Sequence, residues 1–114
     1  DRKQNLSELC QNICQDRKRF LEQLIQARRL GIKLLILCEH GEGISSMRDV
    51  AQWVNPQQKK HPLAMSGVRL HRVLTDLAES YGVEYHFCEK ENTGKTIIKL
   101  LQKAGTETRF PLNG

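Results

Sequence analysis

Two short apolar segments constrain the fold of this chain more than any other feature of its sequence. Residues 32–38 (IKLLILC) are a continuous apolar run, and residues 83–88 (VEYHFC) end in a second one. Each follows a helix-forming stretch that a glycine closes, Gly31 and Gly82 respectively. A strand that is apolar along its whole length is typical of a parallel sheet covered on both faces. The sequence therefore predicts an α/β fold with a largely parallel central sheet flanked by helices.

Helical periodicity occupies most of the remaining chain. The predicted helices cover residues 6–14, 16–30, 46–54, 67–81 and 93–104. On the last of them we expect Ile97, Ile98 and Leu101 to point inward. Residues 55–65 form a long polar connection with two prolines, and residues 105–114 show no period. The chain is thus interpreted as one domain over residues 1–104, followed by an irregular tail.

The charge balance favours a polyanionic partner. Eighteen Lys and Arg face 13 Asp and Glu, which gives a net charge of +5, and 39% of the residues are hydrophobic. Nucleic acid is the commonest partner of such a basic domain, although many basic domains bind none. No apolar run approaches the roughly 20 residues of a membrane span, and no signal peptide opens the chain. We therefore expect no membrane association and a cytoplasmic location.

The four cysteines fit a reducing compartment. Cys10 and Cys14 lie on the apolar stripe of the first helix, and Cys38 and Cys88 end the two apolar runs. Two cysteines four residues apart on a helix could bind zinc, but the chain contains no CxxC pair. Their apolar neighbours favour small buried thiols over a zinc site.

The chain opens on the charged tripeptide Asp1-Arg2-Lys3, directly before the first helix. This tripeptide resembles the DRK or ERK element of XPF-type nucleases in the PD-(D/E)XK superfamily, which ends a strand and precedes a helix. Further features occur in the order that the family shows: Leu6 and Leu9, Arg19-Phe20 with Gln23, the apolar strand ending in Glu39, and the segments SGVRLHRVL and YGVEYHFCEKENTGKTIIKLL, which are similar to those of the small phage-type branch. The resemblance covers residues 1–104 and implies a restriction-endonuclease-like core in a bacterial or phage-encoded protein.

The resemblance also implies an activity, metal-dependent hydrolysis of DNA phosphodiester bonds, with a preference for branched or flapped DNA. In the family, a carboxylate at the position of Asp1 and the backbone carbonyl of Arg2 bind Mg²⁺ or Mn²⁺. Lys3 shares a strand face with Asp1, because side chains alternate along a strand, and it would orient the attacking water or neutralise phosphate charge. The predicted DNA contacts are Arg17, Arg19, Gln23, Lys59 and Lys60.

Two departures from the family pattern keep other functions open. The acidic residue expected four positions after Lys3 is replaced by Ser7, with Glu8 beside it, and no Gly-Asp element precedes Asp1. We therefore expect an N-terminally truncated domain, weakly active or inactive by itself, whose unpaired sheet edge favours self-association, for example as a homodimer. The alternative is a non-catalytic DNA-binding or scaffold module on the same fold. A nucleotide hydrolase is a third hypothesis, because residues 92–96 (NTGKT) follow a strand as a P-loop does.

Overall fold

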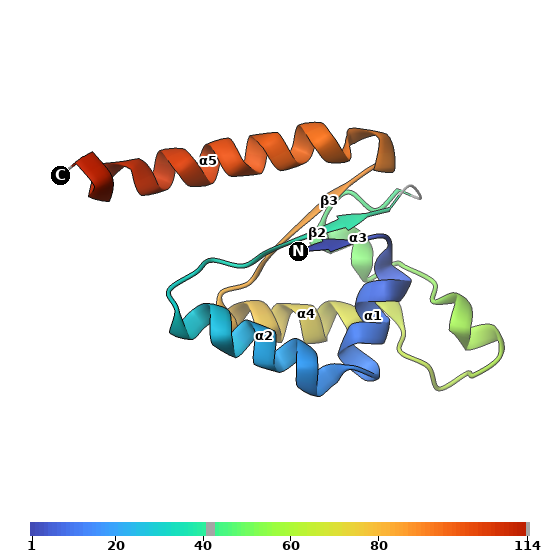
Figure 1. Cartoon of the computed structure of the whole chain (residues 1–114). Helices are drawn as coiled ribbons and strands as arrows, with labels where there is room; N and C mark the ends of the chain where they lie inside the picture. Colours follow the sequence, from blue (N-terminus) through green and yellow to red (C-terminus); the bar gives the residue numbers. More distant parts are fainter. Residues whose placement is uncertain (41–42, 114) are drawn as a thin grey trace.

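A computed structural model describes residues 1–40 and 43–113 of the chain, with side chains up to Ala104, and it has an α/β fold (Figure 1). The elements are β1 (Arg2–Lys3), α1 (Leu6–Cys14), α2 (Arg17–Arg29), β2 (Leu35–Glu39), α3 (Met47–Val50), the 3₁₀ helix η1 (Pro56–Lys59), α4 (Gly67–Tyr81), β3 (Glu84–Cys88), the 3₁₀ helix η2 (Lys90–Asn92) and α5 (Thr93–Asn113). None of the helices in this described part of the chain has the length and apolarity that crossing a membrane requires.

The sheet of the described residues has three parallel strands in the order β1-β2-β3. Arg2 lies opposite Leu37 and Lys3 opposite Cys38, while β2 and β3 pair from Leu35–Glu84 to Glu39–Cys88. The prediction that the two apolar segments are neighbouring parallel strands is confirmed. Both strands therefore end at the same edge of the sheet.

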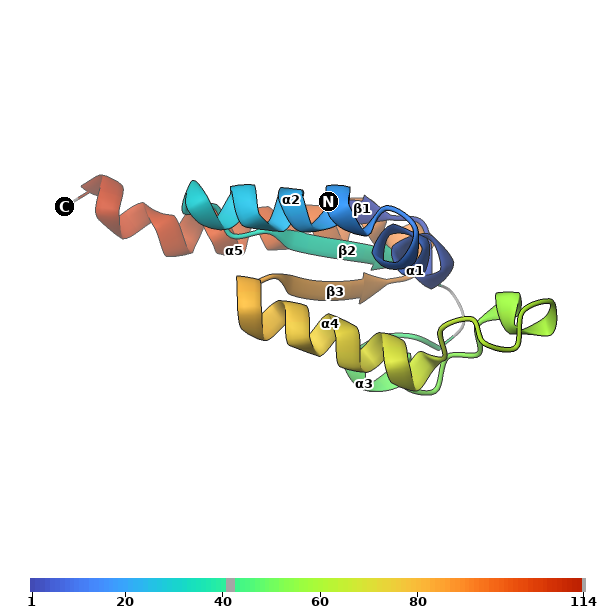
Figure 2. The same ribbon diagram turned by 90° about the horizontal axis from the view of Figure 1, so that it is seen from below.

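The hydrophobic core lies between one face of the sheet and the helices α1, α2 and α4, which Figures 1 and 2 show together on that side. Its fully buried members come from every one of these layers: Leu6, Leu9, Ile13, Leu24, Ile36, Cys38, Leu70 and Leu74. Gly67 lets α4 approach α3 closely, because a Cβ atom there would lie 2.6 Å from the carbonyl oxygen of Val50. The predicted apolar stripes of α1 and α4 thus do face a common core.

The opposite face of the sheet is covered by α5 (Figure 1), and here the predicted burial is wrong. Ile97 is 37% exposed, Ile98 57% and Leu101 66%, although all three were expected to point inward. The physical reason is the partner surface, because this sheet face carries charged side chains, such as Glu39 and Glu84, beside its leucines. An amphipathic period indicates that a helix has an apolar side. Whether that side becomes buried depends on an apolar surface elsewhere in the fold.

Several element boundaries also differ from the predicted ones. The strand β2 begins at Leu35 because Gly31, with φ 70°, and Ile32 close the preceding helix, where the Ile32 N–H donates to the Ala27 carbonyl at 2.8 Å. The helix α5 continues to Asn113, so the prediction of an irregular tail from residue 105 is wrong. A segment without an apolar period lacks a face that can pack against a core, but its backbone can still be helical. A glycine such as Gly105 destabilises a helix by only about 1 kcal/mol.

Candidate functional site

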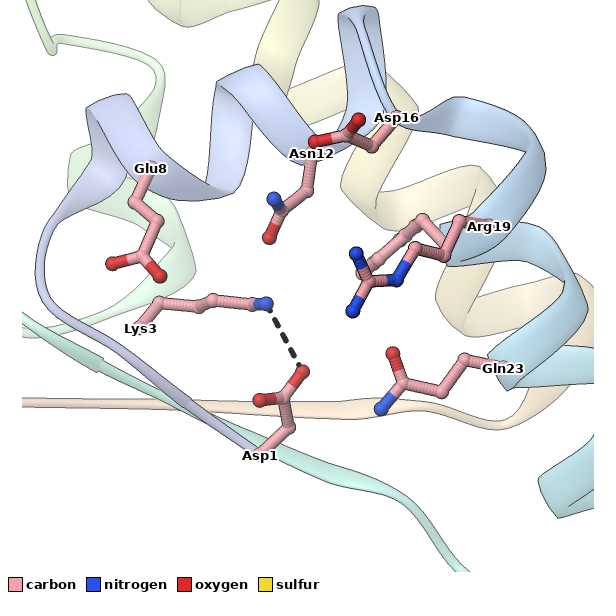
Figure 3. A pocket seen from close by; sticks show the side chains of 8 residues that line it. Asp1, Lys3, Glu8, Asn12, Asp16, Arg19 and Gln23 are labelled. Carbon is pink, nitrogen blue, oxygen red and sulfur yellow. Dashed lines mark ion pairs between the residues drawn. The ribbon is translucent and has the colours of Figure 1, made fainter.

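A hollow of about 330 Å³ opens where β1 meets the helices α1 and α2, and we refer to it as the site hollow. Figure 3 shows the side chains of Lys3, Asn12, Arg19 and Gln23 directed toward a common centre. The residues that line the hollow are Asp1 and Lys3 from β1 and the residue before it, Glu8 and Asn12 from α1, Asp16 from the turn between the helices, and Arg19, Phe20 and Gln23 from α2. Four residues that the sequence singled out, Asp1, Lys3, Arg19 and Gln23, therefore lie around one space.

Strand alternation directs Asp1 and Lys3 into the site hollow. Lys3 is the register partner of Cys38, whose side chain is buried on the core face of β2, so Lys3 and Asp1 also project to that face. The Lys3 Nζ atom lies 3.1 Å from the Asp1 Oδ2 atom, and the two side chains are only 12% and 22% exposed. A carboxylate and an ammonium group are thus held together in a partly desolvated position.

The first turn of α1 adds a second carboxylate, which no sequence motif had assigned to the site. The Asn5 side chain caps the helix by accepting from the Glu8 N–H at 2.8 Å, and the Glu8 carboxylate in turn accepts from the Gln4 N–H at 2.8 Å. These bonds orient Glu8 toward the site hollow, whereas Ser7 lines a different hollow on the other side of α1. The acidic residue beside the expected position is therefore the one that reaches the site.

Asn12 lies one turn after Glu8 and presents an unusual group to the site hollow. Its Oδ1 atom is buried, and within the described residues it has no hydrogen-bond partner. A buried amide oxygen without a donor is costly, so a donor on a bound molecule or water would satisfy it. Only the i, i+4 spacing of Glu8 and Asn12 on one helix face could have indicated these two residues in advance.

The other predicted DNA contacts do not line the site hollow. Arg17 is exposed at the start of α2, and Lys59 and Lys60 are exposed at the end of η1. The η1 segment borders the second hollow on the far side of α1, where His61 and Met65 face Cys10 and Cys14. These three cations therefore lie outside the site hollow that Arg19 and Gln23 line.

Of the two cysteines on α1, Cys10 is buried and Cys14 is exposed. Burial raises the pKa of the Cys10 thiol to about 12, helped by the neighbouring Cys14, whereas Cys14 itself is exposed. Their sulfur atoms lie 3.9 Å apart. The prediction of two buried thiols is thus wrong for Cys14, because Ile13 is the residue of the last turn that faces the core, whereas Cys14 lies on the flank of α1 beside the second hollow.

Arg2, between the two site residues of the strand, points to the opposite face of the sheet. Its Nε atom donates to Glu39 Oε1 at the end of β2, where the Glu39 side chain is 1% exposed. The hydrogen bond from Arg2 holds the pKa of Glu39 below its ordinary value, although burial opposes this, so Glu39 is ionised at neutral pH. The second carboxylate oxygen of Glu39 is buried and has no partner in the described part of the chain.

The site hollow offers carboxylate oxygens, the kind of ligand that Mg²⁺ prefers, from as many side chains as Mg²⁺ usually needs. Within residues 1–40 and 43–104, no three His, Cys, Asp or Glu side chains are placed to hold a metal ion. Mg²⁺, however, is usually held by one or two carboxylates, and waters and substrate phosphates complete its shell. Asp1 and Glu8 supply two carboxylates. The Asp1 carbonyl bonds the Leu37 N–H, and because successive carbonyls alternate in direction, the Arg2 carbonyl faces the open edge of the strand.

Comparisons of the chain with protein-family models, with curated proteins and with solved structures find no match. The resemblance to XPF-type nucleases therefore stands on the motifs of the sequence. The function of the chain has to be inferred from those motifs and from the geometry of the site hollow.

Proposed function

We propose that this chain carries the active site of a metal-dependent DNA endonuclease of the XPF type, acting on branched or flapped DNA. The observation that carries the proposal is the convergence of Asp1, Lys3, Arg19 and Gln23 on one hollow, although they come from separate elements. These residues were selected by motif alone, and a chance set of charged residues has no reason to share a cavity. A small parallel sheet with helices on both faces is compatible with the restriction-endonuclease-like core of that family.

In this proposal each side chain has a defined task. Asp1 and Glu8, with the Arg2 carbonyl, would hold Mg²⁺ or Mn²⁺, and the ion would supply Lewis acidity and an acidified water. The Lys3 ammonium, already beside Asp1, neutralises charge that develops on the phosphate oxygens. Arg19 binds a neighbouring phosphate through its guanidinium fork.

Asn12 and Gln23 complete the proposed mechanism. The buried Asn12 oxygen accepts a hydrogen bond from the attacking water and so directs the water's lone pair toward phosphorus. Gln23, one helical turn after Arg19, extends the phosphate contact along α2. None of these groups is a base-reading element, so recognition depends on the DNA backbone and its shape.

A non-catalytic DNA-binding module is the second candidate, and one observation favours it. The Lys3 ammonium forms an ion pair with the Asp1 carboxylate at 3.1 Å, and this contact competes with a metal ion for the same oxygen. The nucleotide-hydrolase hypothesis has less support, because η2 runs directly into α5 where a P-loop would need an open phosphate-binding loop. Within the described residues β1 has one unpaired edge, which is compatible with self-association. The self-association itself stays a prediction.

Cleavage and binding, measured together on the full-length protein, separate the two candidates. We expect Asp1→Asn and Lys3→Met to lower cleavage of a flapped duplex in Mg²⁺ by about 100-fold or more, with unchanged circular dichroism. The matched controls are Asp76→Asn on the exposed side of α4 and Lys99→Met on α5, which remove the same charges elsewhere. Wild-type cleavage by Asp1→Asn would show that the active site is elsewhere.

The binding measurement uses the same DNA without metal. We expect Arg19→Gln to weaken binding to all sequences about equally, by about tenfold, and to reduce the salt dependence of the dissociation constant. A wild-type protein that binds DNA with this salt dependence but cleaves nothing in Mg²⁺ or Mn²⁺ would establish the binding module instead.

A further inference from the structure

The second hollow, on the far side of α1, has a pair of thiols in one wall. Its volume is about 420 Å³, and Cys10 and Cys14 line it together with residues of the polar connection 55–65. The two cysteines lie four residues apart on one helix, a spacing that places their side chains on the same face. Their sulfur atoms lie 3.9 Å apart, so both can contact a single bound atom.

The distance between the two sulfur atoms fits a metal ion held between them. A bond from a thiolate to a metal is about 2.3 Å long, so two such bonds that meet at an angle of about 115–120° span this distance. That angle is close to the angle of a three-coordinate ion. Two thiolates would then leave one position for a third ligand.

The surroundings of the pair allow an ion to enter and favour the thiolate form. Cys14 is exposed, whereas Cys10 is 6% exposed and belongs to the core. Behind Cys10, the Nδ2 atom of the buried Asn55 donates to the Met65 carbonyl at 2.8 Å and to the Cys10 sulfur at 4.0 Å. A hydrogen bond to sulfur favours its charged form, and such outer donors usually accompany metal ligands.

The number and softness of these ligands indicate which ion fits. Zn²⁺ in a structural site is almost always bound by four side chains. Within residues 1–40 and 43–104, no third His, Cys, Asp or Glu joins the two cysteines in a group that could hold a metal. Soft thiolate and thioether ligands select Cu(I), which is stable with two or three of them. Met65, whose side chain is a thioether, lines the same hollow.

We propose that Cys10 and Cys14 form a binding site for a soft monovalent cation, Cu(I), in the second hollow. Each thiol releases a proton when its sulfur binds the ion, and no electron is transferred, because copper enters and stays as Cu(I). The site is independent of the proposed nuclease function, since Glu8 and Asn12 face the site hollow on the other side of α1.

A titration of the full chain with Cu(I) alone, kept reduced by ascorbate under nitrogen, tests the site. Competition with a coloured Cu(I) chelator measures the affinity. Cys14→Ser changes an exposed side chain, so the fold should persist. We expect it to weaken Cu(I) binding by more than the roughly 10–100-fold that the loss of an outer-shell partner costs a metal site. Binding as tight as that of wild type would overturn the proposal.

Cys88→Ser is the matched control for Cys14→Ser. Cys88 is a free, half-buried thiol at the end of β3, so its replacement removes the same group without touching the pair. We expect this variant to bind Cu(I) as tightly as wild type does. An equal loss in the two variants would mean that Cu(I) binds the cysteines without selection, and the proposal would fail.

Cys10→Ala removes the other proposed ligand. We expect a loss of affinity similar to that of Cys14→Ser, and circular dichroism shows whether the fold survives the change of a buried residue. A folded Cys10→Ala variant with wild-type affinity would leave Cys14 as a single ligand and contradict the proposed pair. If the variant does not fold, Cys14→Ser and its control still decide.

Urea unfolding shows whether the site belongs to the folded chain. A ligand that binds the folded state alone stabilises it, whereas a ligand that binds both states equally does not. We expect Cu(I) to raise the urea midpoint of wild type and of Cys88→Ser, and to leave that of Cys14→Ser unchanged. An unchanged midpoint in wild type would show that the fold does not form the site.

Zinc tests the choice of ion. An excess of Zn²⁺ should neither displace Cu(I) nor raise the urea midpoint, because two sulfur ligands leave the shell of Zn²⁺ incomplete. Stabilisation by Zn²⁺ equal to that by Cu(I) would contradict the assignment of a soft monovalent ion.

Discussion

The two faces of the central sheet are built on different principles. On one face, Ile36 and Cys38 are buried under α1, α2 and α4 in a continuous apolar core. On the other, Leu37 lies next to charged groups, and α5 leaves an apolar hollow of about 200 Å³ above it, beside Ile97 and Leu101. One face is therefore held by close packing, and the other by a few ion pairs under a loosely attached helix.

The site hollow belongs to the closely packed face, and this explains its construction. In the proposed nuclease the catalytic groups would have to be held by side chains that cannot rearrange, and a dense core supplies that rigidity. The α5 face instead holds the ion pair between Arg2 and Glu39, on the side of β1 away from the site hollow. We therefore expect the two faces to differ sharply in what they contribute to stability, with α5 opening at lower free energy than the core helices.

The largest effect should come from the core face. Leu74 on α4 is fully buried, and Leu74→Ala should lower the free energy of unfolding by about 2–5 kcal/mol, because it removes buried methyl groups and leaves a cavity. Urea unfolding followed by circular dichroism measures this change. A loss below about 1 kcal/mol would mean that the two faces are packed to similar density.

An intermediate effect is expected from the charged face, as a dependence of stability on pH. Burial alone would raise the pKa of Glu84, but His86 and Lys33 outweigh burial and lower it. A folded pKa below the unfolded one gives stability that is present above the unfolded pKa and is lost as the pH falls through the folded pKa. Glu84→Gln should therefore flatten the acid side of the curve of unfolding free energy against pH, and identical curves would contradict this assignment.

The smallest effect should come from α5. Leu101 is mostly exposed, so Leu101→Ala should change the free energy of unfolding by less than about 0.5 kcal/mol, although it is the same type of substitution as Leu74→Ala. The same urea titration measures it. A loss comparable to that of Leu74→Ala would show that α5 is packed as firmly as the core helices.

Local patterns predicted most of the fold, because helix and strand periods depend on neighbouring residues. The helices over 6–14 and 67–81 and the parallel pairing of β2 with β3 follow from such patterns. The strand β1 could be expected only from the resemblance, since three charged residues show no strand period. The exposure of the α5 apolar residues could not be predicted, because it depends on what lies opposite them.

The site divides in the same way. Asp1, Lys3, Arg19 and Gln23 could be selected by motif, and their convergence is a result of the fold. Glu8 and Asn12 were missed because their roles depend on the rotation of α1 about its axis. The pair of Arg2 and Glu39 joins residues 37 positions apart, and no local pattern reports such a contact.

The helix α1 separates two hollows, and a spectroscopic probe on one side of it could report on the other side. Glu8 and Asn12 face the site hollow, while Cys14 is exposed and lines the hollow on the opposite side. A helix is only about 10 Å across, so a fluorophore attached to Cys14 would be close to the site without entering it. Cys10 and Cys38 are buried, and burial is the main cause that raises each thiol pKa to about 12, so neither competes for the label. Cys88 is free and only half-buried, so it would be replaced by serine before labelling. A fluorophore on Cys14 would thus allow ligand binding in the site hollow to be followed by fluorescence, from one helix-width away.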